Sequence, residues 1–373
     1  MKDIYMAGAD VGRLEEALVI DALRNGWYEE KYKYCEAFES SFARFHNRKY
    51  ALMTPNCTSA IHLLLASLGI GEGDEVILPE CTWIASAVST VHLGATPIFC
   101  DIEKDSWCLD PQSVRKAITK QTKAIIAVDL FGNMANWEEL NKISEEYKIP
   151  IIEDAAEALG STYNDKPAGS FGIGSTFSFH NTKTITSGEG GMLVLDDDDL
   201  YNKCVKYRDL GRGPNTKPYY NELVGYKFMP FNVQAAFGFA QFRRLPELLL
   251  KKRKHFDFYK EELSGLKVEL NYEPENVHNS AWITTLVLDE SYSMDKDTVI
   301  EELKKLGVPS RPFFYPLSSL PAFDLSNVKR ATYKGNNRNS YKISNRGINL
   351  PGAYNLDEYQ LKFITDSIKK VLE

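Results

Sequence analysis

Short apolar runs and longer helix-periodic segments alternate along the first half of the chain. From about residue 49 to residue 195, runs of four or five apolar residues are separated by stretches whose apolar positions recur with helical spacing. Near-continuous apolar runs of this length are typical of a mainly parallel sheet that helices cover on both faces. Seven strands are predicted, at residues 50–53, 75–78, 96–99, 124–128, 150–153, 176–179 and 192–195.

The other periodic segments are predicted to be helices, and such segments make up a larger share of the chain after residue 200. We therefore expect an α/β fold with two domains, a large one at 1–245 and a smaller α+β one at 246–373. The polar segment 324–341 has no clear period and is expected to be weakly ordered. Helices are predicted at 11–25 and 32–45, from residue 60, and at 111–118, 136–147, 232–245, 247–264, 297–306 and 356–372, with an eighth strand at 282–288.

Composition narrows the class of protein. The 373 residues are 43% hydrophobic and 25% charged with a net charge of −7, which is typical of a soluble globular protein and argues against general affinity for nucleic acid or anionic membrane. We find no apolar run that could span a bilayer, no signal peptide and no metal-ligand spacing. Scattered cysteines without a CxxC pair favour reduced thiols and a cytoplasmic location.

The segment 175–191 carries the first candidate for chemistry. Its strand runs into a polar loop that contains Lys183, and the segment closes on Gly188–Glu189–Gly190–Gly191. Open α/β sheets place their active sites beyond the carboxyl ends of the strands. A partly desolvated lysine there can attack a carbonyl group and form a Schiff base. The alternative is a solvated surface lysine.

Four further candidates follow predicted strands at the same edge of the sheet. Cys57 and Thr58 begin a helix, where backbone N–H groups could bind phosphate or could be capped by a side chain. Trp83 could stack on a flat ring or lie in the core. Asp154 could hold the protonated nitrogen of a pyridine ring or cap a helix, and Ser178 could donate to phosphate or be an ordinary strand residue. Together with Lys183, the set suits pyridoxal phosphate (PLP).

Long segments of the chain resemble the nucleotide-sugar aminotransferases of the DegT/StrS family. That family has the fold type I architecture of PLP-dependent aminotransferases, so the resemblance implies a seven-stranded, mostly parallel sheet between helices. It covers almost the whole chain in the expected order, and its most specific part is SFH, TK and GEGG between 178 and 191. The segments that carry it are 54–87, 94–102, 149–161, 169–197, 224–241 and 310–323.

The resemblance implies a role for each cofactor residue. Lys183 would be the Schiff-base lysine and proton shuttle, Asp154 would pair with the pyridine nitrogen, and Trp83 would stack on the ring. Ser178 and the backbone at residues 57–58 would hold the phosphate. Glu157 falls near the cofactor's ring oxygen, or else makes an ordinary ion pair.

Some positions depart from the family pattern. Lys227 stands where many relatives have an asparagine that reaches the phosphate of the neighbouring subunit's cofactor, so we expect a homodimer with shared active sites. Met229 and Phe231 replace an arginine and a threonine in the same loop, and Cys57 stands where glycine is common. Tyr315 stands where some relatives have a histidine, so the sugar pocket is expected to differ.

The side that binds substrate is less determined by the sequence. Each candidate could contact sugar or nucleotide, and each could instead have a packing or structural role. These candidates are Trp27, Tyr28, His180, Glu189, Arg212 and Tyr315.

As to function, the resemblance implies a transaminase that moves an amino group from L-glutamate to a nucleotide-linked 4-keto-6-deoxyhexose. The product would be a 4-amino-4,6-dideoxy sugar such as GDP-perosamine, for use in O-antigen or other polysaccharide biosynthesis. Sugar 3-amination and cyclitol amination remain alternatives. A non-catalytic PLP-binding regulator is a further alternative, which the set of Lys183, Asp154 and Ser178 disfavours. The related sugar 3-dehydratases have histidine in place of the lysine.

Overall fold

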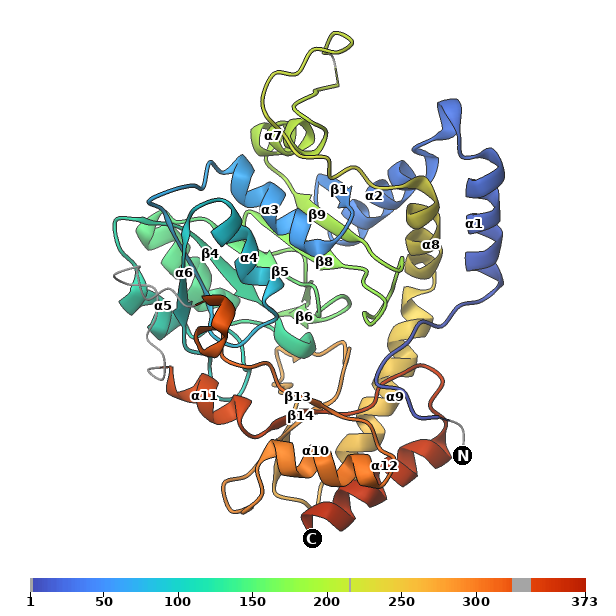
Figure 1. Cartoon of the computed structure of the whole chain (residues 1–373), viewed down its shortest axis with the longest axis vertical. Helices are drawn as coiled ribbons and strands as arrows, with labels where there is room; N and C mark the ends of the chain where they lie inside the picture. Colours follow the sequence, from blue (N-terminus) through green and yellow to red (C-terminus); the bar gives the residue numbers. More distant parts are fainter. Residues whose placement is uncertain (1–2, 215, 324–336) are drawn as a thin grey trace.

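The structure is a computed structural model that describes residues 3–214, 216–323 and 337–373. Within these residues, seven strands form one sheet in the order β1-β9-β8-β5-β4-β2-β3 (Figure 1). All seven strand predictions are therefore confirmed, and they belong to the same sheet. The strands are β1 (Tyr50–Thr54), β2 (Glu75–Pro79), β3 (Thr96–Cys100), β4 (Thr122–Val128), β5 (Ile151–Asp154), β8 (Gly174–Ser178) and β9 (Gly191–Leu195).

One strand runs against the others. β9 pairs antiparallel with both β1 and β8, whereas the neighbouring pairs from β8 to β3 are parallel. The start of β9 therefore lies at the sheet edge where the other strands end. Gly191 is opposite Thr54 on one side and Ser178 on the other, and Thr176 of β8 is opposite Asp154 of β5.

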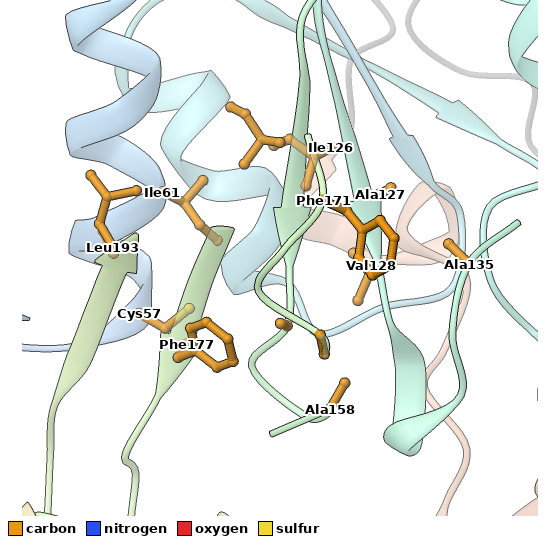
Figure 2. Packing of buried hydrophobic residues seen from close by; sticks show 14 of the residues in the cluster. Cys57, Ile61, Ile126, Ala127, Val128, Ala135, Ala158, Phe171, Phe177 and Leu193 are labelled. Carbon is orange, nitrogen blue, oxygen red and sulfur yellow. The ribbon is translucent and has the colours of Figure 1, made fainter. Parts of the chain in front are cut away.

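Helices cover both faces of this sheet because alternate residues of its strands point to opposite sides. On β8, the Phe177 ring packs 4.9 Å from Phe42 of α2. Gly174, three residues away on the same strand, faces Leu64 of α3. In Figure 2, Ile61 of α3 lies near Leu193 of β9 within the same buried cluster. The α-helices between residues 13 and 243 are α1 (Arg13–Asn25), α2 (Lys33–Phe45), α3 (Cys57–Ser67), α4 (Ala85–His92), α5 (Pro111–Ala117), α6 (Trp137–Tyr147), α7 (Asp198–Arg208) and α8 (Asn232–Arg243).

The C-terminal part has its own sheet, in the order β10-β12-β14-β13, and a second buried cluster that includes Leu286, Leu303 and Ile348. The helix predictions at 247–264, 297–306 and 356–372 are confirmed to within two residues, and the strand predicted at 282–288 begins later, at Thr285. The elements of the C-terminal part are α9 (Leu245–Glu262), β10 (Val268–Leu270), β12 (Thr285–Leu288), α10 (Lys296–Lys305), β13 (Arg311–Pro312), α11 (Arg338–Ser344), β14 (Gly347–Asn349) and α12 (Glu358–Leu372).

Several short elements were not predicted. Strands β6 (Thr162–Tyr163), β7 (Lys166–Pro167) and β11 (Val277–His278) form a small third sheet. Single turns of 3-10 helix occur at Tyr28–Glu30, Leu130–Gly132, Leu317–Ser319 and Pro321–Phe323.

The expectation of weak order for 324–341 has two outcomes. Residues 324–336 lie outside the described part of the chain. From Arg338 the chain is helical, so for the end of the segment the expectation is wrong. The reason is tertiary, because the backbone N–H and hydroxyl of Ser340 both donate to Asp101 at the end of β3. The division into domains at residue 245 stays a prediction.

Across the three described ranges, none of the helices combines the length and apolarity that a membrane crossing requires. Over the same ranges, no group of three or more His, Cys, Asp or Glu side chains is placed to hold a metal ion.

Candidate active site

Lys183 lies in the loop between β8 and β9 and is largely shielded from water. Its Nζ donates to Glu157 Oε1 at 2.9 Å, and the two side chains are 14% and 5% exposed. The same Nζ lies 4.0 Å from the centroid of the Trp282 ring, which is a favourable cation–π distance. Lys183 therefore does not have the surroundings of a solvated surface lysine.

Glu157 is held in turn by the loop after β4. Its Oε2 accepts a hydrogen bond of 3.1 Å from the backbone N–H of Phe131. Phe131 has a φ of 56°, a left-handed conformation that is uncommon for a bulky residue and must be maintained by its surroundings. This turn directs the N–H at the carboxylate, so both oxygens of Glu157 have donors.

Asp154 ends β5 and is 3% exposed. Its Oδ2 accepts from Ser86 Oγ of α4 at 2.7 Å, and its Oδ1 accepts from the Ala156 N–H at 3.2 Å. Burial raises the pKa of Asp154, and the Ser86 hydrogen bond and the charge of Lys183 oppose that rise. A buried carboxylate whose hydrogen-bond donors are neutral groups is costly, and such groups cluster at functional sites.

The turn between β1 and α3 forms a possible anion site. Asn56 caps α3 by accepting from the Ser59 N–H at 2.8 Å, so the helix begins at Cys57. Gly191 packs against this turn so closely that a Cβ there would lie 2.4 Å from the Asn56 carbonyl carbon and 2.5 Å from the Cys57 nitrogen. Ser178 is the register partner of Gly191. A helix N-terminus beside a serine hydroxyl can bind phosphate.

Cys57 connects this turn with Asp154. Its Sγ lies 3.9 Å from Asp154 Oδ1, and burial raises the pKa of its thiol well above the usual value. Cys57 is therefore a neutral thiol at the base of the site. Thr58 is half-buried, and its carbonyl accepts from Ser89 Oγ of α4, which ties α3 to α4.

Aromatic side chains form a continuous wall from Trp83 to Lys183. Trp83 follows β2 and is 60% exposed, so it does not lie in the core. Its ring is 5.9 Å from Phe314, which stacks on Phe131 at 5.3 Å, and Phe131 stacks on Trp282 at 6.2 Å. An exposed Trp83 has a face free to stack on a planar ligand.

Two of the substrate candidates lie together beside the lysine loop. His180 Nε2 is 3.6 Å from Glu189 Oε1, and His180 Nδ1 is 3.0 Å from the Thr182 hydroxyl. Lys183 donates its backbone N–H to the carbonyl of His180, so this pair is within one turn of the lysine.

Another pair gathers around Asp209 at the end of α7. Lys227 Nζ and Arg212 Nη2 each lie 2.6 Å from an oxygen of Asp209, and both cations lower the pKa of that carboxyl group against the opposing effect of burial. A cavity of about 330 Å³ is lined by Arg212 and by Tyr219. Within the single chain, Lys227 is engaged by Asp209 rather than by residues of the Lys183 loop.

The remaining substrate candidates have contacts of their own. Trp27 donates its Nε1–H to the Leu23 carbonyl at 2.8 Å, and Tyr28 is 92% exposed with a φ of 52°. Tyr315 lies under the ammonium of Lys296, 4.7 Å from its ring centroid. The structure does not bring these three side chains into contact with Lys183.

Sequence reasoning missed several residues that shape the site. Trp282 contacts the lysine, Ser86 donates to Asp154, and Phe131 donates to Glu157. Trp282 and Lys183 are about a hundred positions apart, so no local pattern links them. Ser86 and Phe131 follow β2 and β4, and only the meeting of these strand ends with the end of β5 at one sheet edge indicates that they lie near Asp154 and Glu157.

These groups fit PLP by the chemistry of their donors. A shielded lysine matches its aldehyde, a buried carboxylate matches its ring nitrogen, and the α3 N-terminus with Ser178 matches its phosphate. Gly191 leaves room where a side chain would press on the phosphate turn. The fold and the site together define the class of PLP-dependent aminotransferases.

Comparisons with known proteins agree. Residues 10–369 match the model of the DegT/DnrJ/EryC1/StrS aminotransferase family, and the chain belongs to this family. The GDP-perosamine synthase of Vibrio cholerae is 38% identical over 95% of both chains, and that of Caulobacter vibrioides is 35% identical over 96% of this chain and 95% of its own. The PLP-form structure of Spr1654 from Streptococcus pneumoniae superposes with a TM-score of 0.92 at 28% identity, covering 99% of this chain and 98% of that one.

The comparisons confirm the predicted family, the aminotransferase fold and the dependence on PLP. This chain is therefore a PLP-dependent aminotransferase.

Proposed function

We propose that this aminotransferase moves an amino group from L-glutamate to C4 of a nucleotide-linked 4-keto-6-deoxyhexose, giving a 4-amino-4,6-dideoxy sugar such as GDP-perosamine. The observation that carries the proposal is the 38% identity to a GDP-perosamine synthase over nearly the full length of both chains. The product would then enter polysaccharide biosynthesis, of which O-antigen assembly is one form.

Lys183 carries the proton in this proposal. When bound, PLP supplies an electron sink for the carbanion that forms at the donor carbon. Lys183 Nζ would hold the cofactor between turnovers and, once free, would carry the proton to and from the donor carbon. The Glu157 carboxylate and the Trp282 ring face define where the free ammonium rests.

Asp154 and the phosphate turn hold the cofactor in register with Lys183. The Asp154 carboxylate would accept a hydrogen bond from the protonated ring nitrogen, and Ser86 fixes the orientation of that carboxylate by donating to Oδ2. Ser178 and the first N–H groups of α3 bind the phosphate. Trp83 would cover one face of the ring, and its exposure supports this role.

The test begins with the purified protein and PLP. We expect a visible absorption band that glutamate bleaches and that Lys183→Ala abolishes. With GDP-4-keto-6-deoxymannose, NMR of the product should place the new amine at C4. Amination at C3, or of a cyclitol only, would overturn the substrate assignment, and a protein that stays colourless would overturn the role of Lys183.

A homodimer with shared active sites is part of the proposal. The segment that carries Lys227 exposes several large apolar side chains, namely Tyr219, Tyr220, Val224 and Phe231. Exposed apolar patches of this kind mark interaction surfaces. The Lys227 side chain is 55% exposed and could exchange Asp209 for a phosphate across a two-fold interface.

Mixing two inactive variants tests whether the sites are shared. If Lys183 and Lys227 of different subunits form one site, a mixed dimer of Lys183→Ala and Lys227→Ala has one intact site. An equal mixture, reassociated after dissociation, should then regain about a quarter of wild-type activity. No recovery, or an active monomer in sedimentation, would contradict the shared site.

We also propose a cytoplasmic location. All six cysteines are free thiols and buried, which suits a reducing compartment. Detection of the native protein by fractionation in an oxidising compartment would contradict this location.

A further inference from the structure

Both backbone carbonyls that flank Lys183 are held by side chains from the C-terminal part of the chain. Trp282 Nε1–H donates to the Thr182 carbonyl at 2.7 Å, and the Tyr354 hydroxyl donates to the Thr184 carbonyl at 2.7 Å. Trp282 precedes β12 and Tyr354 follows β14, so the two donors reach the loop from separate segments. The backbone is thus held at the residue before Lys183 and at the residue after it.

The loop needs these donors because its own hydrogen bonds close only its ends. The Lys183 N–H bonds to His180 and the Ser187 N–H bonds to Phe179, but residues 181–186 belong to no helix or strand. Thr184 is buried, and a buried carbonyl that lacks a partner is destabilising. The Tyr354 hydroxyl therefore satisfies a group that this conformation of the loop leaves without a backbone donor.

The side chains of Trp282 and Tyr354 are themselves held in place by packing contacts. Trp282 is buried and stacks on Phe131 at an angle of 21°. Lys252 Nζ lies over the Tyr354 ring, 4.6 Å from its centroid, and donates to the Gly352 carbonyl at 2.6 Å. Little side-chain freedom is left for Trp282 or Tyr354 to lose when they bind the loop.

We infer that Trp282 and Tyr354 are positioning residues, which hold the backbone on both sides of Lys183 so that only the lysine side chain moves during the reaction. Trp282 has a second contact with the lysine, since its ring face receives the free ammonium. The position of the C-terminal sheet thereby sets the direction from which Lys183 Nζ approaches its targets. This inference rests on the catalytic role of Lys183 in the proposed function.

The experiment compares Tyr354→Phe with a matched control, Tyr259→Phe. Tyr259 is buried, whereas Tyr354 is half-buried, and the Tyr259 hydroxyl donates to the Pro351 carbonyl at 2.9 Å, away from the lysine loop. Each variant loses one tyrosine hydrogen bond to a backbone carbonyl, at Thr184 in the lysine loop for Tyr354→Phe and at Pro351 for Tyr259→Phe. Any difference between them reports on the loop rather than on general stability.

The first readout needs no cofactor. Amide hydrogen exchange of residues 183–186 in the apo protein should be faster by about tenfold in Tyr354→Phe, the effect of one lost hydrogen bond, and unchanged in Tyr259→Phe. Trp282→Phe, which keeps an aromatic ring but loses the N–H donor, should also raise the exchange of this segment.

The second readout uses the loaded protein. In Tyr354→Phe, the pH midpoint of the visible band of the lysine-bound cofactor should shift, and kcat should fall about tenfold with little change in the KM for the sugar. Equal behaviour of Tyr354→Phe and Tyr259→Phe in exchange and in the pH midpoint would overturn the inference. Failure of the proposed function would instead appear as absent turnover in the wild type, with the difference in exchange preserved.

Discussion

Lys183 Nζ and Glu157 Oε1 lie 2.9 Å apart, in an ion pair that water barely reaches. A buried charge that loses its partner is left uncompensated, which commonly destabilises a protein by about 3–5 kcal/mol. Glu157 has a second donor in the Phe131 N–H, whereas the lysine has the Trp282 face. The pair is therefore expected to be energetically coupled before any cofactor binds.

A double-mutant cycle on the apo protein measures this coupling. Glu157→Gln should lower the free energy of unfolding, because the Lys183 ammonium loses its carboxylate. Glu157→Gln in a Lys183→Met background should cost about 1–3 kcal/mol less than in the wild type. Urea unfolding provides the four free energies, and additive effects of the two substitutions would show that the pair is not coupled.

Asp154→Asn should separate activity from stability. Because burial raises the pKa of this carboxyl group, the folded state binds its proton more tightly than the unfolded state does, and the ionised form opposes folding as pH rises. The amide oxygen can still accept from the Ala156 N–H while the amide NH2 group donates to the Ser86 hydroxyl. At neutral pH the apo variant should be as stable as the wild type or more stable, while kcat falls by about 10²–10³ because the ring nitrogen loses its carboxylate.

The measurements for this variant are turnover with saturating PLP and urea unfolding of the apo protein. A large loss of stability would show that Asp154 has a mainly structural role. Unchanged turnover would remove Asp154 from the cofactor site.

Gly191→Ala should damage the phosphate turn. Its Cβ would lie within 2.5 Å of backbone atoms of residues 56 and 57, which cannot move like a side chain. We expect a loss of about 3 kcal/mol in stability and weaker binding of PLP, measured by urea unfolding and by titration of the visible band. Gly265→Ala is the control, because nothing lies within 4 Å of its added Cβ and the change should stay within about 0.5 kcal/mol. Equal effects of both substitutions would contradict the close approach.

Stability should depend on pH through Lys252. Burial lowers the pKa of this lysine to about 7, well below its value of 10.5 in the unfolded chain. Between these values the unfolded state holds a proton that the folded state lacks, so the free energy of unfolding rises with pH; below pH 7 both states hold the proton and the cost of the buried charge is fully present.

Lys252→Met should remove this slope. Between pH 7.5 and 9, about 1.5 pH units, the wild type should gain about 2 kcal/mol relative to the variant, at ~1.4 kcal/mol per unit. Parallel stability curves for the two proteins would show that Lys252 stays charged on folding. His255 lies near Lys252 and has a pKa lowered by burial to about 4, so it remains neutral across this range.

The large sheet could be predicted because most of its strands are local apolar runs, while β8 is indicated by alternating strand-forming residues. Strands of two or three residues, such as β7 and β13, leave no such pattern and depend on the partners that the fold provides. The same distinction applies to the site. Lys183, Asp154 and Ser178 could be grouped because the ends of neighbouring strands meet at one edge.

Contacts made by distant segments could not be predicted in this way. Trp282 and Tyr354 are ordinary aromatic positions in the sequence, and only the packing of the C-terminal sheet brings them to the lysine loop. The family resemblance predicts that Lys227 reaches the phosphate of a neighbouring subunit's cofactor, whereas within the single chain it pairs with Asp209. That choice depends on assembly, which no pattern within one sequence determines.

The reversed direction of β9 has a consequence for the order in which the molecule is made. Among the described strands, β1 lies at the sheet edge and pairs with β9 alone, although about 140 residues separate them along the chain. During synthesis, β1 therefore stays unpaired with any of these strands until β9 has left the ribosome. The insertion of β9 brings Gly191 against the turn at Asn56, so the phosphate-binding corner takes shape in the same late event that completes the sheet.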